Sequence, residues 1–137
     1  MNPIETLLRD HINAIIHKGP VTELEIAQAE QELGIQFSED LKTYLKICGC
    51  LSYKSRELYG LGVPETSYLN IVGSTKEMRR MGLPHTLVVV EELGEGHYAV
   101  CDTNDEIHEW SLYKDKVFPK KISPSFSSYL AELFAGE

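Results

Sequence analysis

The cysteines and one histidine form the first set of residues that could perform chemistry. A thiol of Cys48 or Cys101 could act as a nucleophile, with His97 as its base. Cys48, however, falls on an apolar stripe of helical spacing, and Cys101 falls within an apolar strand pattern. Cysteine in such surroundings commonly behaves as a small hydrophobic residue. The sequence therefore favours a structural role for these thiols, and an odd count of three cysteines forms no disulfide framework.

A second candidate lies between Asp102 and His108, where Asp102, Asp105, Glu106 and His108 could gather around a metal ion. The run Asp102–Glu106 lacks the glycine and the distant glutamate that a calcium loop requires. Aspartate and asparagine are also the residues that a tight turn favours. We therefore predict a hairpin turn here, with no metal and no other cofactor.

Two further motifs lack the surrounding residues or geometry that their chemistry requires. Gly94-Glu95-Gly96-His97 follows a predicted strand, as phosphate loops do, but it has no Gly-Lys-Ser/Thr ending and no following helix. Glu91 and Glu92 could form the acid pair of a glycoside hydrolase. Adjacent strand residues point to opposite faces, so the two carboxylates would not converge without a bulge. The sequence thus predicts no enzyme.

Acidic residues are concentrated in two segments that contain no lysine or arginine. Thirteen of the 21 acidic residues lie in residues 22–40 and 91–109, and the chain has a net charge of −8. In the first segment, Glu25 completes a capping box, and Glu39 and Asp40 suit the first turn of a helix. The second segment holds more acids than its turns require, and we expect it to bind a partner. Its acids are Glu91, Glu92, Glu95, Asp102, Asp105, Glu106 and Glu109.

The length of 137 residues is typical of one domain, residues 1–137. A strongly negative chain repels nucleic acid and anionic membranes, which excludes them as expected partners, and attracts basic proteins. The first residues lack the basic and apolar regions of a signal peptide, and no apolar run is long enough to span a membrane. We therefore expect a cytoplasmic protein.

Apolar periodicity predicts an α+β order of elements. Helices are expected from residue 3 to about 16, over 22–33 and 38–48, from 74 to 81, and from 123 to 134. A short strand is expected at Leu69–Val72. Strands at 86–93, 97–102 and 106–112, joined by short turns, predict an antiparallel meander. N-terminal helices and a C-terminal helix would flank this central, mostly antiparallel sheet.

The ordered set of motifs resembles the Smi1/Knr4-like domains of the SUKH superfamily. In that family a helix ending in Leu-Gly precedes a second helix that carries a Tyr/Phe-Leu pair. Here Ser38 replaces the common proline, and Gly49-Cys50 replaces the usual Asn-Gly-Gly. The matching segments span residues 22–134 in the family order: Glu25–Gly34, Ile35–Leu45, Leu58–Leu61, Val88–Val90, Asp102-Thr103, Glu109-Trp110 and Ser125–Leu130.

The resemblance implies a non-enzymatic binding protein with no catalytic residues to carry over. Many bacterial members of the superfamily resemble immunity proteins that neutralise polymorphic toxins, often nucleases. Fungal relatives are linked to cell-wall assembly and signalling. The leading hypothesis is a cytosolic immunity protein whose acids at 91–109 occlude a basic toxin domain. The alternative is a regulatory protein-interaction module of the cell-wall or signalling kind.

Overall fold

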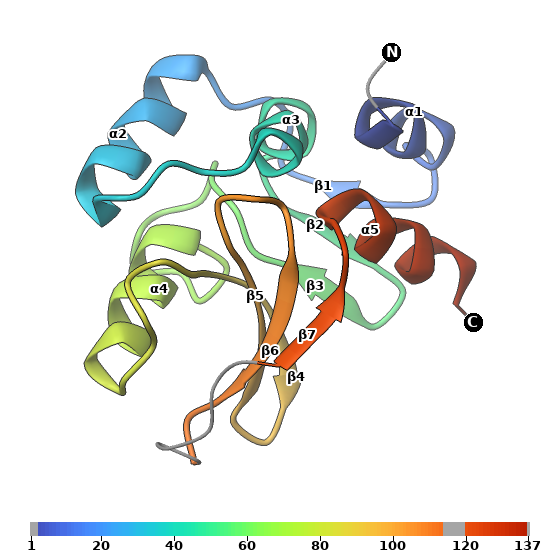
Figure 1. The fold of residues 1–137 in the computed structure, drawn as a ribbon. Coiled ribbons are helices and arrows are strands. Elements are labelled where there is room, and N and C mark those ends of the chain that lie inside the picture. The colour runs from blue at the N-terminus through green and yellow to red at the C-terminus, as the bar shows by residue number, and fades with distance from the viewer. Residues whose placement is uncertain (1–2, 114–119, 137) are drawn as a thin grey trace.

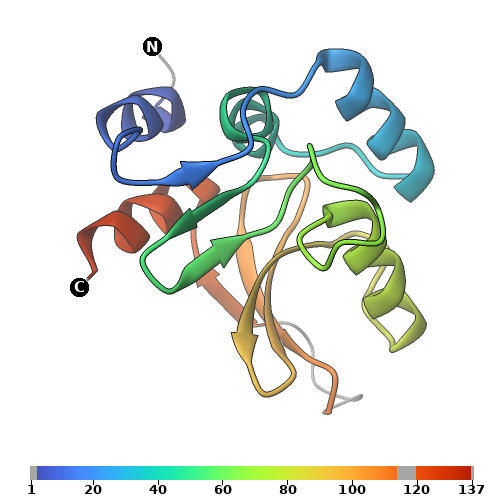
Figure 2. The ribbon, with the colours of Figure 1, turned by 180° about the vertical axis from the view of Figure 1, so that it is seen from behind.

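The computed structural model describes residues 3–113 and 120–136, which form two antiparallel sheets and five helices (Figures 1 and 2). The small sheet has the order β1-β2-β3, and the large sheet is the meander β4-β5-β6-β7. No helix in these ranges is long and apolar enough to cross a membrane. The elements are α1 (Pro3–Asp10), β1 (Ile16–His17), α2 (Glu23–Leu33), α3 (Glu39–Cys48), β2 (Leu51–Tyr53), β3 (Arg56–Leu58), α4 (Ile71–Arg80), β4 (Val88–Gly94), β5 (His97–Cys101), β6 (Ile107–Ser111), β7 (Lys120–Ser123) and α5 (Phe126–Ala135).

The large sheet is buried on both faces, which explains the continuous apolar run that opens β4. One face contributes Val88, Val90 and Ala99 to the main core, together with residues of α1, α2, α3 and α5. The other face contributes Val89 and Val100 to a smaller cluster that includes residues of α4. A strand buried on both sides gains from apolar residues at every position, so alternation is lost.

Local capping chemistry confirms the predicted starts of α2 and α3. The Thr22 hydroxyl accepts a hydrogen bond from the Glu25 N–H, and the Glu25 carboxylate accepts one from the Thr22 N–H. Gly34 ends α2 in the left-handed region, with a φ of 66°. The Ser38 hydroxyl accepts the Leu41 N–H, so serine replaces the family's usual proline without loss of a cap. Each such cap contributes about 1 kcal/mol.

Three predicted boundaries were wrong because pairing or capping elsewhere in the fold overrides the local pattern. The first helix ends at Asp10, and Ile16–His17 instead forms β1, which pairs with β2. Residues 69–72 do not form a strand, and α4 begins at Ile71 rather than at residue 74, because Asn70 caps it by accepting the N–H groups of Val72 and Gly73. The last helix does not start at residue 123. It starts at Phe126, because Ser123 still belongs to β7, where it pairs with Ile107 of β6.

Gly60 lies where two backbone segments approach each other closely. It forms a parallel bridge with Asn70, which closes the loop between β3 and α4 at its base. Its N–H donates to the Leu69 carbonyl at 2.8 Å, and its carbonyl accepts the Ile71 N–H at 2.7 Å. A Cβ atom at this position would lie 1.7 Å from the Gly49 carbonyl oxygen. Only glycine allows the two backbone segments to meet here.

We predict that Gly60→Ala lowers the free energy of unfolding by about 3 kcal/mol, because the clash is with backbone that cannot rotate away. Urea denaturation monitored by circular dichroism measures the change. Gly136→Ala is the matched control, because its Cβ would have ordinary contacts at 3.4 and 3.6 Å. Equal stability of the two variants would contradict the close approach.

Candidate functional site

The large sheet distributes the seven predicted acids over different locations. The β4–β5 hairpin, with Glu92 and Glu95, lies at one end of the sheet, and the β5–β6 turn, with Asp102, Asp105 and Glu106, lies at the other (Figure 1). Glu109 pairs with Ala99 in the middle of the strands. Side-chain alternation divides them further, because cross-strand partners share a face. The seven residues therefore do not form one cluster.

Glu91 is almost completely buried. Its side chain lies under α5, where the Arg56 guanidinium donates two hydrogen bonds to it, from Nε at 2.6 Å and Nη2 at 2.7 Å. The Tyr129 hydroxyl also donates to the carboxylate. Burial and the charge of Glu91 raise the pKa of Tyr129. Only 3% of Glu91 is exposed, so we remove it from the predicted binding surface.

A β-bulge gives Glu91 this position. Val89 pairs with Val100 while Glu91 pairs with Ala99, so Val90 is the extra residue on β4. The bulge turns Glu91 towards the face that packs against α5. Glu92 pairs with Tyr98 and points to the opposite face. The adjacent acids pair with successive residues of β5, as expected for opposite faces, and the Glu91 carboxylate is already bound by Arg56 and Tyr129.

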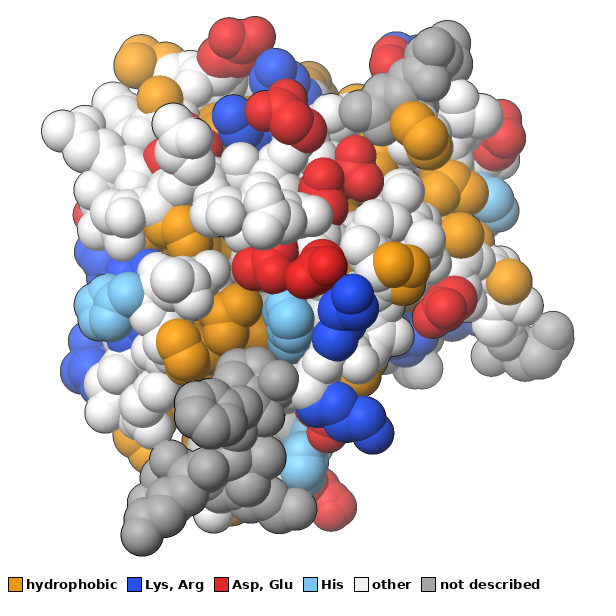
Figure 3. Space-filling view, in the orientation of Figure 1, with side chains coloured by type: hydrophobic (Ala, Val, Ile, Leu, Met, Phe, Trp, Pro, Cys, Tyr) orange, Lys and Arg blue, Asp and Glu red, His pale blue; other side chains and the backbone are white. Residues whose placement is uncertain are grey.

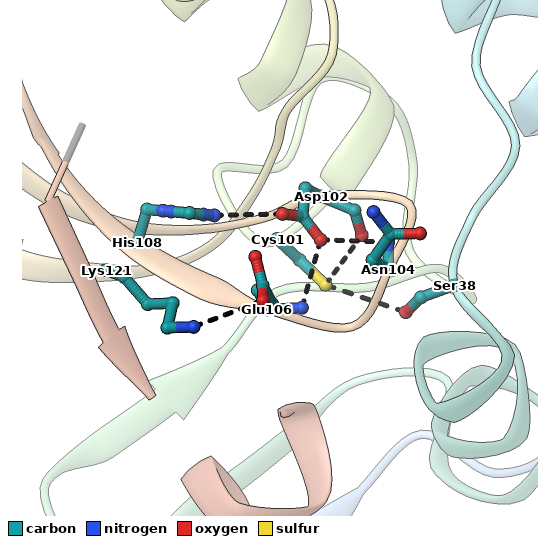
Figure 4. Close-up of polar contacts among 7 residues, drawn as sticks. All are labelled: Ser38, Cys101, Asp102, Asn104, Glu106, His108 and Lys121. Atoms are coloured by element: carbon teal, nitrogen blue, oxygen red, sulfur yellow. Dashed lines mark hydrogen bonds and ion pairs between the residues drawn. The ribbon is translucent and has the colours of Figure 1, made fainter. Parts of the chain in front are cut away.

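Asp102 organises the β5–β6 turn (Figure 4). Its Oδ1 accepts the N–H groups of Asn104 at 2.9 Å and Glu106 at 3.0 Å, which confirms the predicted turn. Its Oδ2 lies 2.9 Å from His108 Nε2. Burial alone would raise the pKa of Asp102, but the hydrogen bonds from His108 and the two backbone N–H groups together lower it. The carboxylate thus stabilises the turn in its charged form.

The same turn brings potential metal ligands together. Atoms of Asp102, Glu106 and His108 lie within 4.8 Å of one another, the one such group found among residues 3–113 and 120–136. Both Asp102 oxygens, however, already have hydrogen-bond partners. The Lys121 ammonium lies 3.2 Å from the Glu106 carboxylate, where it would repel a cation. Hairpin and ion-pair geometry accounts for the cluster without a metal ion.

The β5–β6 turn also adjoins the first turn of α3. Asp105 Oδ1 accepts the Asp40 N–H at 3.2 Å, and burial followed by the charge of Asp105 raises the pKa of Asp40. In the space-filling view, acidic side chains gather near the middle of the face shown in Figure 1, with lysine, arginine and histidine side chains beside them (Figure 3). This end of the sheet therefore presents acids that are partly neutralised by their neighbours.

The thiols lack the properties of a nucleophile. Burial raises the pKa of Cys101 to about 12, and its Sγ lies 3.6 Å from the Ser38 hydroxyl (Figure 4). Burial also raises the pKa of Cys48 to about 12. His97 is at the other end of β5 from Cys101, with its Nδ1 3.1 Å from Glu109. Protonated, buried thiols separated from the histidine fit the structural role that the sequence favours.

Glu92 lines two adjoining hollows that the sequence analysis did not predict, and Glu95 is exposed in the turn that follows β4. The hollows have volumes of about 260 and 360 Å³, and they share Tyr59, Tyr68 and Glu92 as walls. Neither Glu92 nor Glu95 forms an ion pair within the part of the chain that the structure describes. The sequence signal for the hollows is weak, because Tyr68 lies in a loop without periodicity.

A SUKH family model described as SMI1-KNR4 cell-wall matches residues 1–135. The chain belongs to this family. Its SUKH fold is also found in a crystal structure of a protein from Pseudomonas syringae pv. tomato, with a TM-score of 0.77 and 16% identity. That match covers 94% of this chain and 96% of the other. A search of curated proteins gave no match. Membership of the SUKH family supports a general role as a protein-interaction module.

We predict that Glu91→Gln lowers the free energy of unfolding by about 2–3 kcal/mol. Arg56 would lose its counter-charge, and the Tyr129 hydroxyl would lose a charged hydrogen-bond acceptor. Urea denaturation at neutral pH measures the loss. Glu92→Gln, one residue along the same strand but exposed, should change stability by less than about 0.5 kcal/mol. Equal effects at the two positions would show that Glu91 has no special structural role.

A second prediction concerns acid stability. Because the folded-state pKa of Asp102 is lowered from 3.8, its carboxylate stabilises the fold above that pH, and this contribution is lost as the pH falls through the folded value. Asp102→Asn should therefore cost about 1 kcal/mol at pH 7 and progressively less below pH 3.8. Urea denaturation across the pH range tests this, with Glu95→Gln as an exposed control. A pH-independent difference would contradict the charged hydrogen bonds.

Proposed function

We propose that this SUKH protein is an immunity-type protein that binds a toxin domain of the nuclease kind and blocks its active site by occlusion. The observation that supports it is the set of acids that stay at the surface of the large sheet in a segment without lysine or arginine. This set is Glu92, Glu95, Asp102, Asp105, Glu106 and Glu109. A nuclease needs a basic groove to hold phosphates. An acidic surface complements that groove, accelerates encounter and excludes the substrate.

The dimensions of the sheet are compatible with one interface. A standard interface buries roughly 800 Å² on each partner. A five-residue strand such as β5 spans about 17 Å, so both acidic ends can fall within one such patch. By strand alternation, Glu92, Asp102 and Glu106 point to the side of the sheet that α4 covers, whereas Glu109 points to the other. Those three residues are the subset best placed to act together.

The alternative is a regulatory interaction module of the cell-wall or signalling kind. The description of the matching family, SMI1-KNR4 cell-wall, favours it. A module that recognises its ligand through shape and apolar contacts would keep its affinity when surface acids are reversed. The immunity hypothesis requires the opposite, because electrostatic complementarity to a basic groove is its source of rapid association. Charge reversal therefore separates the two hypotheses.

We predict that the toxin encoded next to this gene stops growth when expressed alone, and that co-expression of this protein restores growth. Glu92→Lys with Glu106→Lys should slow association with the toxin at least tenfold at low salt, measured by surface plasmon resonance, because both residues belong to the subset that faces one side of the sheet. The matched control is Glu23→Lys with Glu132→Lys, which makes the same charge change at exposed positions outside the proposed surface. Equal slowing by both pairs would indicate general charge attraction only. The immunity hypothesis fails if no neighbouring gene encodes a toxin and no nuclease is inhibited.

A further inference from the structure

The two hollows beside β4 adjoin each other and share Tyr59, Tyr68 and Glu92 as walls. The first is lined by residues of β3, β4 and the loops on either side of β3, and the second by residues of the β3–α4 loop, α4, β4 and β5. Figure 2 shows these elements on one side of the molecule. We call the two together the tyrosine–glutamate groove and define it by its tyrosines and by those of its glutamates that form no ion pair with the described residues: Tyr59, Tyr68, Tyr98, Glu57, Glu77 and Glu92.

The aromatic walls are held in place before any ligand arrives. Tyr68 is 61% exposed, yet its hydroxyl donates to both oxygens of the Glu57 carboxylate, at 2.7 and 2.9 Å. Its ring lies edge-on to Tyr59, with centroids 6.4 Å apart. Tyr59 is itself fixed, because its N–H donates to the Val90 carbonyl at 2.8 Å. An exposed ring that is already ordered loses little conformational entropy on binding.

The loop that carries Tyr68 is anchored at both ends. Gly60 and Asn70 bridge at its base, and the Glu65 carbonyl packs against Gly73 in the first turn of α4. A Cβ atom at Gly73 would lie 2.3 Å from that carbonyl oxygen. The loop therefore has a defined position against α4, and the distance across the groove is set by backbone contacts.

The groove carries excess negative charge. Glu57, Glu77 and Glu92 form no ion pair within residues 3–113 and 120–136. Of the cations that line it, Arg56 is already neutralised by Glu91, and Arg80 lies only in the second hollow. Burial and the charge of Glu92 raise the pKa values of Tyr59 and Tyr98. Such surroundings attract a cation and repel phosphate or carboxylate groups.

We propose that the tyrosine–glutamate groove binds an arginine side chain from an exposed basic segment of a partner protein. The guanidinium would lie against the Tyr68 ring and hydrogen-bond to Glu57 and Glu92. Arginine suits the groove better than lysine, because its planar group stacks on aromatic faces and presents five donors in a fixed geometry.

This inference deepens the proposed function, since it rests on a basic protein partner and names the chemical group that the partner inserts. It also explains why an exposed tyrosine is hydrogen-bonded to a carboxylate. A guanidinium that enters the first hollow would share Glu57 with the Tyr68 hydroxyl and would neutralise Glu92. Binding would thus relieve the repulsion among carboxylates that the unliganded groove contains.

The test uses the full chain and the acetylated, amidated peptide Gly-Ser-Arg-Gly-Arg-Ser-Gly, with a second peptide in which citrulline replaces both arginines. Fluorescence of Trp110, whose ring centroid is 6.2 Å from that of Tyr98, reports the affinity, and amide shifts in nuclear magnetic resonance spectra locate the site. We expect saturable binding of the arginine peptide, with shifts centred on residues 57–68 and 92–98, and at least tenfold weaker binding of the citrulline peptide. Equal affinity for the arginine and citrulline peptides would overturn the proposal. Free arginine that binds as tightly as the arginine peptide would also overturn it, because the groove would then be a site for a small molecule.

Variants separate the groove from general surface charge. Tyr68→Ser and Glu92→Gln should each weaken the arginine peptide at least fivefold, whereas Tyr68→Phe should retain most of the affinity. Tyr113→Ser is the matched control, because Tyr113 is 70% exposed and lies outside the groove. All of these positions are exposed, and thermal unfolding confirms that each variant folds. Equal behaviour of Tyr68→Ser and Tyr113→Ser would overturn the proposal.

These experiments distinguish failure of the groove proposal from failure of the immunity hypothesis. If the arginine peptide binds the groove but no toxin is inhibited, the groove stands and the immunity hypothesis fails. If growth is rescued by wild type and equally by Tyr68→Ser, and the peptide does not bind, the immunity hypothesis stands and the groove fails.

Discussion

The Glu91 carboxylate links three parts of the fold at one buried point. It belongs to β4 of the large sheet, its guanidinium partner Arg56 belongs to β3 of the small sheet, and Tyr129 belongs to α5. A buried carboxylate is costly unless its oxygens have donors, so these elements must meet at one point. The bulge at Val90 makes the meeting possible by turning Glu91 away from the α4 side of the sheet.

The same bulge connects this internal ion pair to the external groove. The carbonyl of the bulged residue, Val90, accepts the Tyr59 N–H and thereby ties the chain after β3 to β4. Tyr59 is fixed against the smaller cluster, and Glu92 emerges beside it on the opposite face from Glu91. Two adjacent glutamates thus have different roles because the sheet separates them. One carboxylate is buried against Arg56 and Tyr129, and the other remains exposed.

Sequence reasoning succeeded where the deciding contacts are local. The Thr22–Glu25 box, the left-handed Gly34 and the Asp102 turn each depend on residues within a few positions of one another. It failed where the deciding contacts join residues that are far apart in the sequence. The sequence does not distinguish Glu91 from Glu92. Glu91 has a structural role because it bonds to Arg56 and Tyr129, which are more than thirty positions away. A strand of two residues such as β1 has no periodicity to detect, and the groove needs a loop whose path is set by Gly60.

The structure gives the two acidic segments different physical explanations. In residues 22–40, Glu30 accepts the Phe37 N–H at 2.8 Å and Glu32 contacts Lys76 at 3.1 Å. Glu23 and Glu39 contact lysines of α3, each at 3.3 Å. These acids are offset by local donors, so their charge needs no partner. Glu92 and Glu95 have no such offset within the described ranges. A surface selected only for solubility would not need to place uncompensated carboxylates beside ordered tyrosines, and this difference is the reason to seek the partner at the β4–β5 hairpin.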